Sequence, residues 1–120
     1  MRGLSHAFAE LLQRAADPDR LHWEELRPGV GLHALYGQPG KGPAAALLRY
    51  APGASVPEHR HIDYEHILIL QGSQRDANGL YPAGTLLVSP PGSQHAVTSE
   101  AGCLVLAIWS GPLDFEINTD

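Results

Sequence analysis

The apolar residues of this chain follow two patterns, one helical and one extended. Near the amino terminus they recur at helical spacing, at Leu4, Phe8, Leu11, Leu12 and Ala15. This spacing predicts one amphipathic helix over residues 4–16. The sequence Asp17-Pro18-Asp19 should end the helix, because proline cannot continue it. Beyond this point no helical period persists.

After residue 20, short apolar runs alternate with Gly and Pro, which is typical of strands joined by turns. The runs cover residues 30–36, 44–50, 66–71, 84–89, 96–99 and 103–109. Asn78-Gly79 is a strong hairpin signal, and Pro90-Pro91-Gly92 requires another sharp reversal. About six to ten short strands at this spacing predict an all-β sandwich or barrel. We expect residues 1–20 to form a helical extension and residues 21–120 to form the barrel domain.

Two predicted strands, 65–71 and 103–109, are apolar on both faces. A strand covered on one side only would alternate apolar and polar residues. The outer residues, among them Leu68, Leu70 and Leu106, therefore need cover from the N-terminal helix or from a second subunit. We expect a homodimer, because two-fold dimers are the commonest oligomers.

Length, charge and cysteine content narrow the class of protein. The 120 residues are enough for one domain with an ordinary core. The net charge is −5 and the arginines are scattered, so we expect no nucleic-acid partner. No apolar run is long enough to span a membrane, and the first residues lack the apolar core of a secretory signal. With a single cysteine, Cys103, the chain cannot form an internal disulfide, which fits a cytoplasmic location. We expect Cys103 to be a buried inert thiol rather than a redox sensor.

One short segment contains several candidate metal ligands. His59 and His61 are two positions apart, so on a strand their side chains point to the same side. Glu65 follows a short bend and can return to the same point, and His95 is a fourth candidate about thirty residues later. Imidazole nitrogens with one carboxylate suit divalent Zn, Mn, Fe, Ni or Cu. The alternative is that these are exposed loop histidines beside a solvated strand. Alternation turns His66 to the opposite face.

The same residues fit two motifs of a known family. The first motif is matched by Gly53, His59, His61, Glu65 and Gly72. The second is matched by Gly84, Pro90, Gly92 and His95, with Ser99 where the motif has asparagine. The chain therefore resembles the cupin superfamily. The sequences at residues 48–53, 81–85, 90–93 and 100–103 are similar to its ChrR-type branch, which includes the sensor domains of zinc-dependent anti-sigma factors and small stand-alone dioxygenase-like cupins.

This resemblance implies a double-stranded β-helix, the jelly-roll barrel of cupins. It also implies that His59, His61, Glu65 and His95 hold a divalent metal, namely Zn, Fe, Mn or Ni, beside a small-molecule ligand in the barrel. A metal-dependent oxygenase, a non-catalytic sensor and a dimeric β-barrel with a vestigial metal site are all compatible with these residues. A sigma-factor partner is not expected, because the related anti-sigma factors carry an N-terminal zinc domain and this chain has no cysteine before Cys103.

Strand alternation predicts which residues line the barrel near the ligands. They are Ile67, Ile69 and Gln71, together with Val97 and one register of Val105, Ala107 and Trp109. Such a lining is mainly apolar and suits a small organic molecule. Tyr50, Tyr64 and Tyr81 are expected either to donate hydrogen bonds to this pocket or to serve as packing residues.

Overall fold

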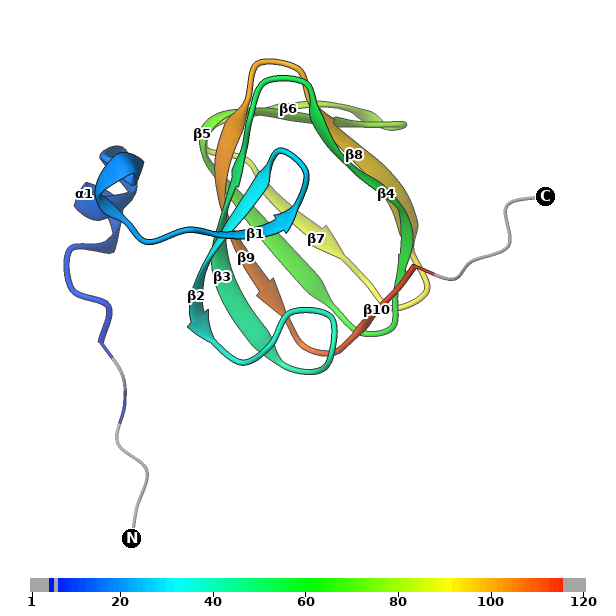
Figure 1. Cartoon of the computed structure of the whole chain (residues 1–120). Helices are drawn as coiled ribbons and strands as arrows, with labels where there is room; N and C mark the ends of the chain where they lie inside the picture. Colours follow the sequence, from blue (N-terminus) through cyan, green and yellow to red (C-terminus); the bar gives the residue numbers. More distant parts are fainter. Residues whose placement is uncertain (1–4, 6, 116–120) are drawn as a thin grey trace, which may run out of the picture.

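The computed structural model describes residue 5 and residues 7–115, and it consists mainly of antiparallel strands curled around an interior (Figure 1). A short helix, α1 (Leu11–Ala16), and a 3-10 turn, η1 (Pro18–Arg20), precede the strands. The strands are β1 (Glu24–Arg27), β2 (Val30–Tyr36), β3 (Ala44–Tyr50), β4 (Ala54–His61), β5 (Glu65–Asp76), β6 (Gly79–Pro82), β7 (Leu86–Ser89), β8 (Gln94–Ser99), β9 (Cys103–Trp109) and β10 (Leu113–Asp114). The all-β prediction is confirmed.

Strand β5 joins two sheets. Its first part pairs with β9 and β7, and beyond β9 that sheet continues through β3, β2 and β1. Its second part pairs with β6 and β8, and beyond β8 that sheet continues through β4 and β10. The change of partner occurs at Gly72, whose φ is 75°. A Cβ atom there would collide with the carbonyl oxygen of Gly102, so only glycine fits this crossing.

The main core lies between the two sheets. On β3 and β9, alternate side chains point inward, including Leu48, Tyr50, Val105 and Trp109. They pack against Ile67 and Ile69 of β5 and against Val56 and Val97 of the opposite sheet. The sequence did not decide which alternate residues of 103–109 face inward. In the structure they are Val105, Ala107 and Trp109.

The helix is shorter than predicted. α1 begins at Leu11, and the residue before it, Glu10, has a left-handed backbone with φ 57°. Residues 5 and 7–10 are not helical, and Leu4 lies outside the described residues. A short helix is marginal unless packing supports it. Ala15 is buried against the sheet, whereas Phe8 stays 40% exposed and is not part of that apolar cluster, so packing supports residues 11–16 rather than residues 7–10. The predicted end before Pro18 is confirmed.

A second apolar cluster covers part of the outer sheet surface. Leu47 and Leu104 from the sheet pack with Ala15 and Leu21, and Leu70 and Leu106 are partly buried at its edge. The N-terminal segment thus supplies part of the cover that the sequence required. Leu86, Val88 and Ile108 on the same sheet remain 57%, 50% and 37% exposed. None of the helices among the described residues is both long and apolar enough to cross a membrane.

The prediction that Gln71 lines the interior is wrong. The pairing of β5 with β9 shifts between Ile69 and Gln71, so Gln71 lies opposite the outward-facing Leu104. The Gln71 side chain is exposed, and its Nε2 donates to the Ala15 carbonyl at 3.2 Å. Such a bulge redirects a side chain to the other face of a strand.

The outer cluster gives a test of what holds α1 in place. We expect Leu47→Ala to lower the free energy of unfolding by about 2 to 5 kcal/mol, because Leu47 is fully buried under the N-terminal segment. Leu80→Ala, at an exposed position on β6 in the other sheet, should change it by less than about 0.5 kcal/mol. Urea unfolding of both variants measures this difference, and equal stability of the two would contradict the packing described.

Candidate metal centre

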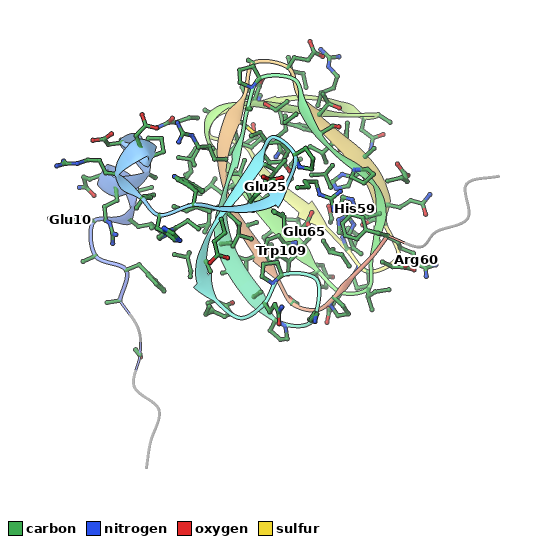
Figure 2. The ribbon with its side chains drawn as sticks, in the orientation of Figure 1. Glu10, Glu25, His59, Arg60, Glu65 and Trp109 are labelled. Carbon is green, nitrogen blue, oxygen red and sulfur yellow. The ribbon has the colours of Figure 1, made fainter. Side chains whose placement is uncertain are left out.

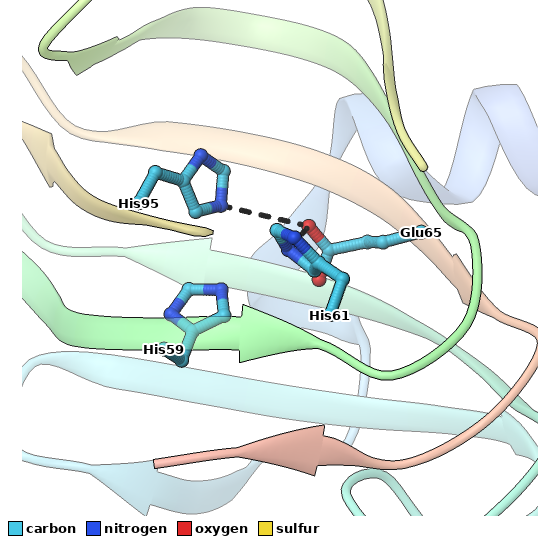
Figure 3. Close-up of side chains that lie close together, drawn as sticks. All are labelled: His59, His61, Glu65 and His95. Carbon is cyan, nitrogen blue, oxygen red and sulfur yellow. Dashed lines mark hydrogen bonds and ion pairs between the residues drawn. The ribbon is translucent and has the colours of Figure 1, made fainter. Parts of the chain in front are cut away.

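The structure brings the four predicted side chains together. His59 and His61 come from β4, and His59 lies directly opposite His95 of β8. Glu65 is the first residue of β5, after the bend at residues 62–64. The ligand atoms of all four residues lie within 4.8 Å of one another (Figure 3). Figure 2 shows the site inside the barrel, where His59, Glu65 and Trp109 are labelled.

The three imidazole rings surround one point. Their centroids are 4.9 Å apart for His59 and His61, and 4.8 Å apart for each of these with His95. Glu65 Oε1 lies 3.0 Å from His61 Nε2 and 3.8 Å from His95 Nε2. His59, His61 and Glu65 are buried, and His95 is nearly so. The exposed-loop alternative for these histidines is therefore wrong.

Each ring is held by the nitrogen that points away from the centre. The Nδ1 of His59 lies 2.9 Å from the Pro57 carbonyl, and that of His95 lies 3.3 Å from Asp76 Oδ2. The Nδ1 of His61 contacts the Ser93 Oγ at 2.9 Å and the Ser93 carbonyl at 3.1 Å. When Nδ1 donates to these oxygens, the Nε2 lone pair is free to bind a metal, as in most protein metal sites.

Glu65 is oriented by a tryptophan from β9. The indole Nε1 of Trp109 donates to Glu65 Oε2 at 2.7 Å, which leaves Oε1 facing the histidines. Burial by itself raises the pKa of Glu65, but hydrogen bonding to His61 and the nearness of His95 outweigh it and hold that pKa well below its usual range. The carboxylate is therefore charged at neutral pH.

The pKa values of His59 and His95 shift in opposite directions. Burial lowers the pKa of His59, and its hydrogen bond to the Pro57 carbonyl offsets this only in part. Burial also lowers the pKa of His95, but the Glu65 and Asp76 carboxylates outweigh it and raise the pKa above its usual value. A neutral His59 beside a charged Glu65 is the protonation state that metal binding requires.

The donor set fits a divalent transition metal. His95 Nε2 is buried, points to the centre and has no hydrogen-bond partner among the described residues. A buried nitrogen without a partner is unfavourable, and a metal ion at the centre would satisfy it. Three imidazoles and one carboxylate, drawn from the three strands β4, β5 and β8, are ligands suited to Zn, Fe, Mn or Ni.

A cavity of about 90 Å³ opens beside the site and touches His59, Glu65 and His95. Its other walls are mostly apolar and include Leu48, Val56, Ile67, Val97 and Trp109. Of the tyrosines considered, Tyr50 lines the cavity, Tyr64 is exposed, and Tyr81 donates to Asp76 Oδ1 at 3.0 Å. Burial raises the pKa of Tyr50, so its hydroxyl stays protonated.

Sequence reasoning did not identify the residues that hold the ligands. Ser93 and Asp76 bind the outer nitrogens of His61 and His95, and Trp109 binds Glu65. Asp76 belongs to the turn marked by Asn78-Gly79, but nothing in the sequence indicates that it faces His95. Ser93 lies in the turn before β8, and nothing in the sequence indicates that it faces His61.

The remaining titratable candidates lie apart from the site. His66 is on the outer face, stacked on Tyr64 with ring centroids 6.1 Å apart. His33 Nδ1 contacts the His22 carbonyl, and His6 lies outside the described residues. Cys103 is buried, and burial raises the pKa of its thiol, as expected for an inert cysteine.

Comparison with known proteins identifies the family of this chain. Residues 13–113 match the family described as the ChrR cupin-like domain. The anti-sigma-E factor ChrR of Cereibacter sphaeroides is 35% identical over 98 residues, which are 79% of this chain and 45% of that protein. The chain thus spans less than half the length of this curated relative.

Solved structures share the fold. The complex of SigE with the anti-sigma ChrR from Rhodobacter sphaeroides gives a TM-score of 0.65 at 24% identity, covering 91% of this chain and 70% of that one. An acetylacetone dioxygenase from Acinetobacter johnsonii gives a TM-score of 0.76 at 14% identity, covering 99% and 83%. The protein is a cupin, and the predicted jelly-roll class is confirmed. Within the cupins, the chain belongs to the ChrR cupin-like domain family.

The face assignment of the histidines can be tested by metal titration. We expect His61→Ala to weaken binding of Zn(II) by a factor of about 100 or more, because it removes one of four donors. His66→Ala should bind Zn(II) as the unmodified chain does, since His66 lies on the other face of β5. Isothermal titration calorimetry gives both constants, and similar losses in the two variants would contradict the assignment.

Proposed function

We propose that this protein binds a divalent transition metal through His59, His61, Glu65 and His95 and acts as a small dioxygenase-like enzyme. The observation that carries this proposal is the convergence of four donors at the wall of an apolar cavity, where His95 Nε2 has no hydrogen-bond partner among the described residues. A site that only stabilises the fold would have no need of an adjoining space for a ligand.

The residues around the cavity would bind and shield a substrate beside the metal. The metal, when bound, supplies Lewis acidity and a template for a substrate with oxygen donors, such as a dicarbonyl. Ile67, Val97 and Trp109 form apolar walls that exclude water from the ligand. Glu65 contributes one negative charge to the site, and Trp109 fixes its orientation. The fold shared with an acetylacetone dioxygenase is consistent with this reaction class.

The alternative function is a non-catalytic sensor of a metal or small molecule. It is favoured by the 35% identity to the anti-sigma-E factor ChrR, a homologue that has been solved in complex with SigE. A sensor would need the same four donors, so the site alone does not separate the two functions. Zinc with full coordination and no turnover would mark the sensor, whereas a redox-active metal with a free position would mark the enzyme.

Oxygen consumption distinguishes the two functions. We expect protein loaded with Fe(II), Mn(II) or Ni(II) to consume oxygen with small dicarbonyl or catechol-like substrates, and Zn(II)-loaded protein not to do so. Glu65→Gln should abolish turnover, because it removes the charge that offsets the metal. Glu100→Gln is the matched control, since Glu100 is exposed and pairs with Arg75 away from the site.

A retained rate in Glu65→Gln would contradict the assigned role of Glu65. No oxygen uptake with any metal and substrate pair would favour the sensor function. Metal content is measured in every preparation, so that loss of the metal is not mistaken for loss of chemistry.

We further propose that the protein is a homodimer that pairs through the uncovered part of the outer sheet. Val88, His66 and Ile108 lie side by side across β7, β5 and β9, and Leu86 and Leu68 form the next row. This stripe has no acidic or basic residue other than His66. An uncharged apolar surface can pack against its own copy about a two-fold axis without like-charge repulsion.

Light scattering at micromolar concentration should return twice the mass of one chain. Val88→Asp should shift the protein to the monomer, because it places a charge on the apolar stripe. Leu80→Asp is the control, because Leu80 is equally exposed but lies on β6, in the other sheet. A monomer from the unmodified chain would contradict the proposal.

A further inference from the structure

Arg27 lines the cavity beside the metal centre, and none of the acidic residues that the structure describes forms an ion pair with it. Its Nε is buried without a hydrogen-bond partner among the described residues. Four other arginines pair with carboxylates at the surface: Arg20 with Asp17, Arg49 with Asp19, Arg60 with Asp114, and Arg75 with Glu100. A buried guanidinium donor left unpaired beside a cavity is the arrangement expected where a ligand supplies the acceptor.

A bulge in β1 turns Arg27 inward. Glu25 pairs with Gly31, but Arg27 pairs with Val30, so Leu26 is an extra residue in the strand. Directly paired residues share a face of the sheet, and Val30 belongs to the inner core. Had the register continued, Leu26 would face Val30 and Arg27 would lie outside. Bulges that redirect a side chain in this way are common next to functional sites.

One aromatic ring, that of Phe115, contacts both Arg27 and the metal ligand candidate His59. Its guanidinium lies over the Phe115 ring, 4.9 Å from the centroid. The same ring is 5.1 Å from the centroid of the His59 imidazole. Phe115 therefore lies between the arginine and a candidate metal ligand, and both border the same cavity. A ligand in this cavity would therefore border both the metal centre and Arg27.

The charges of the site favour an anionic ligand. The two positive charges of a divalent ion would be matched by the carboxylates of Glu65 and of Asp76, which holds His95. The charge of Arg27 is then left for the ligand to balance. The rest of the cavity is mostly apolar, so one charged group and a small apolar body suit it.

We propose that Arg27 is a specificity-determining residue that selects small monoanionic organic ligands by donating hydrogen bonds to a carboxylate or enolate oxygen pair. The planar guanidinium can donate to two oxygens at once, which a neutral isostere such as an amide cannot match. This proposal rests on the proposed function, because it names the ligand class of the same metal centre.

The test compares carboxylates with their neutral amides. Acetate, propionate and isobutyrate, and the corresponding amides, are titrated into the Zn(II)-loaded full chain and into the metal-free chain, with binding followed calorimetrically. We expect the unmodified chain to prefer each carboxylate over its amide. Arg27→Gln should weaken carboxylate binding by about 10-fold or more, the size of a charge-assisted hydrogen bond, and change amide binding less than about twofold.

Two further variants separate charge from structure. Arg27→Lys keeps the charge and should retain part of the carboxylate preference, because an ammonium group cannot form the bidentate contact. Arg49→Gln removes an exposed arginine that pairs with Asp19 and should behave as the unmodified chain. Zn(II) affinity of every variant shows whether the barrel is folded and the four-residue centre intact.

The proposal is overturned if no carboxylate binds at millimolar concentration, or if Arg27→Gln leaves the carboxylate preference unchanged. It is also overturned if the variant weakens acids and amides equally, because that result would show a purely structural role. Failure of the metal centre is seen separately, as absent Zn(II) binding in the unmodified chain. In that case the metal-free titrations still decide whether Arg27 selects anions.

Discussion

The buried carboxylate of Glu65 is the group on which the arrangement of this site depends. An ionised carboxylate inside a protein costs several kcal/mol unless partners surround it. Here the partners come from three different strands: His61 from β4, Trp109 from β9 and, slightly farther, His95 from β8. The same contacts therefore fix the carboxylate and hold the strands of both sheets around one point. This explains why the metal donors can be preorganised before any metal binds.

Strand β5 makes this convergence possible by belonging to both sheets. Glu65 begins the part that pairs with β9, and Asp76 ends the part that pairs with β6. The chain crosses between the sheets at Gly72, where only glycine fits. One strand thus delivers a candidate ligand at one end and, at the other, the residue that orients His95. On its outer face, the same strand presents the apolar side chains that α1 covers only in part.

Sequence reasoning could predict the features that depend on local periodicity. The alternation along β4 places His59 and His61 on one side, and the predicted strands match β2, β3 and β9. It could not predict the bulges that redirect Gln71 and Arg27. The bulge near Leu70 turns Gln71 outward and depends on pairing with the distant strand β9. The bulge at Leu26 turns Arg27 inward against β2, the next strand along the chain, and depends on a register that the residue pattern does not fix. The contact of Asp76 with His95 is equally non-local. Residues 7–10 are not helical, because helix propensity without a packing partner does not stabilise a short helix.

The central claim is that these four side chains form a resident metal site, and metal content tests it most directly. Protein expressed without a histidine tag and purified without added metal is analysed by mass spectrometry of its elements, beside a variant that combines His59→Ala with His95→Ala. The account predicts about one divalent transition-metal ion per chain in the unmodified protein and a trace in the variant, because loss of two donors leaves too few ligands. The account would be contradicted by equal metal content in the two, or by unmodified protein that stays free of metal even after incubation with Zn(II) or Fe(II).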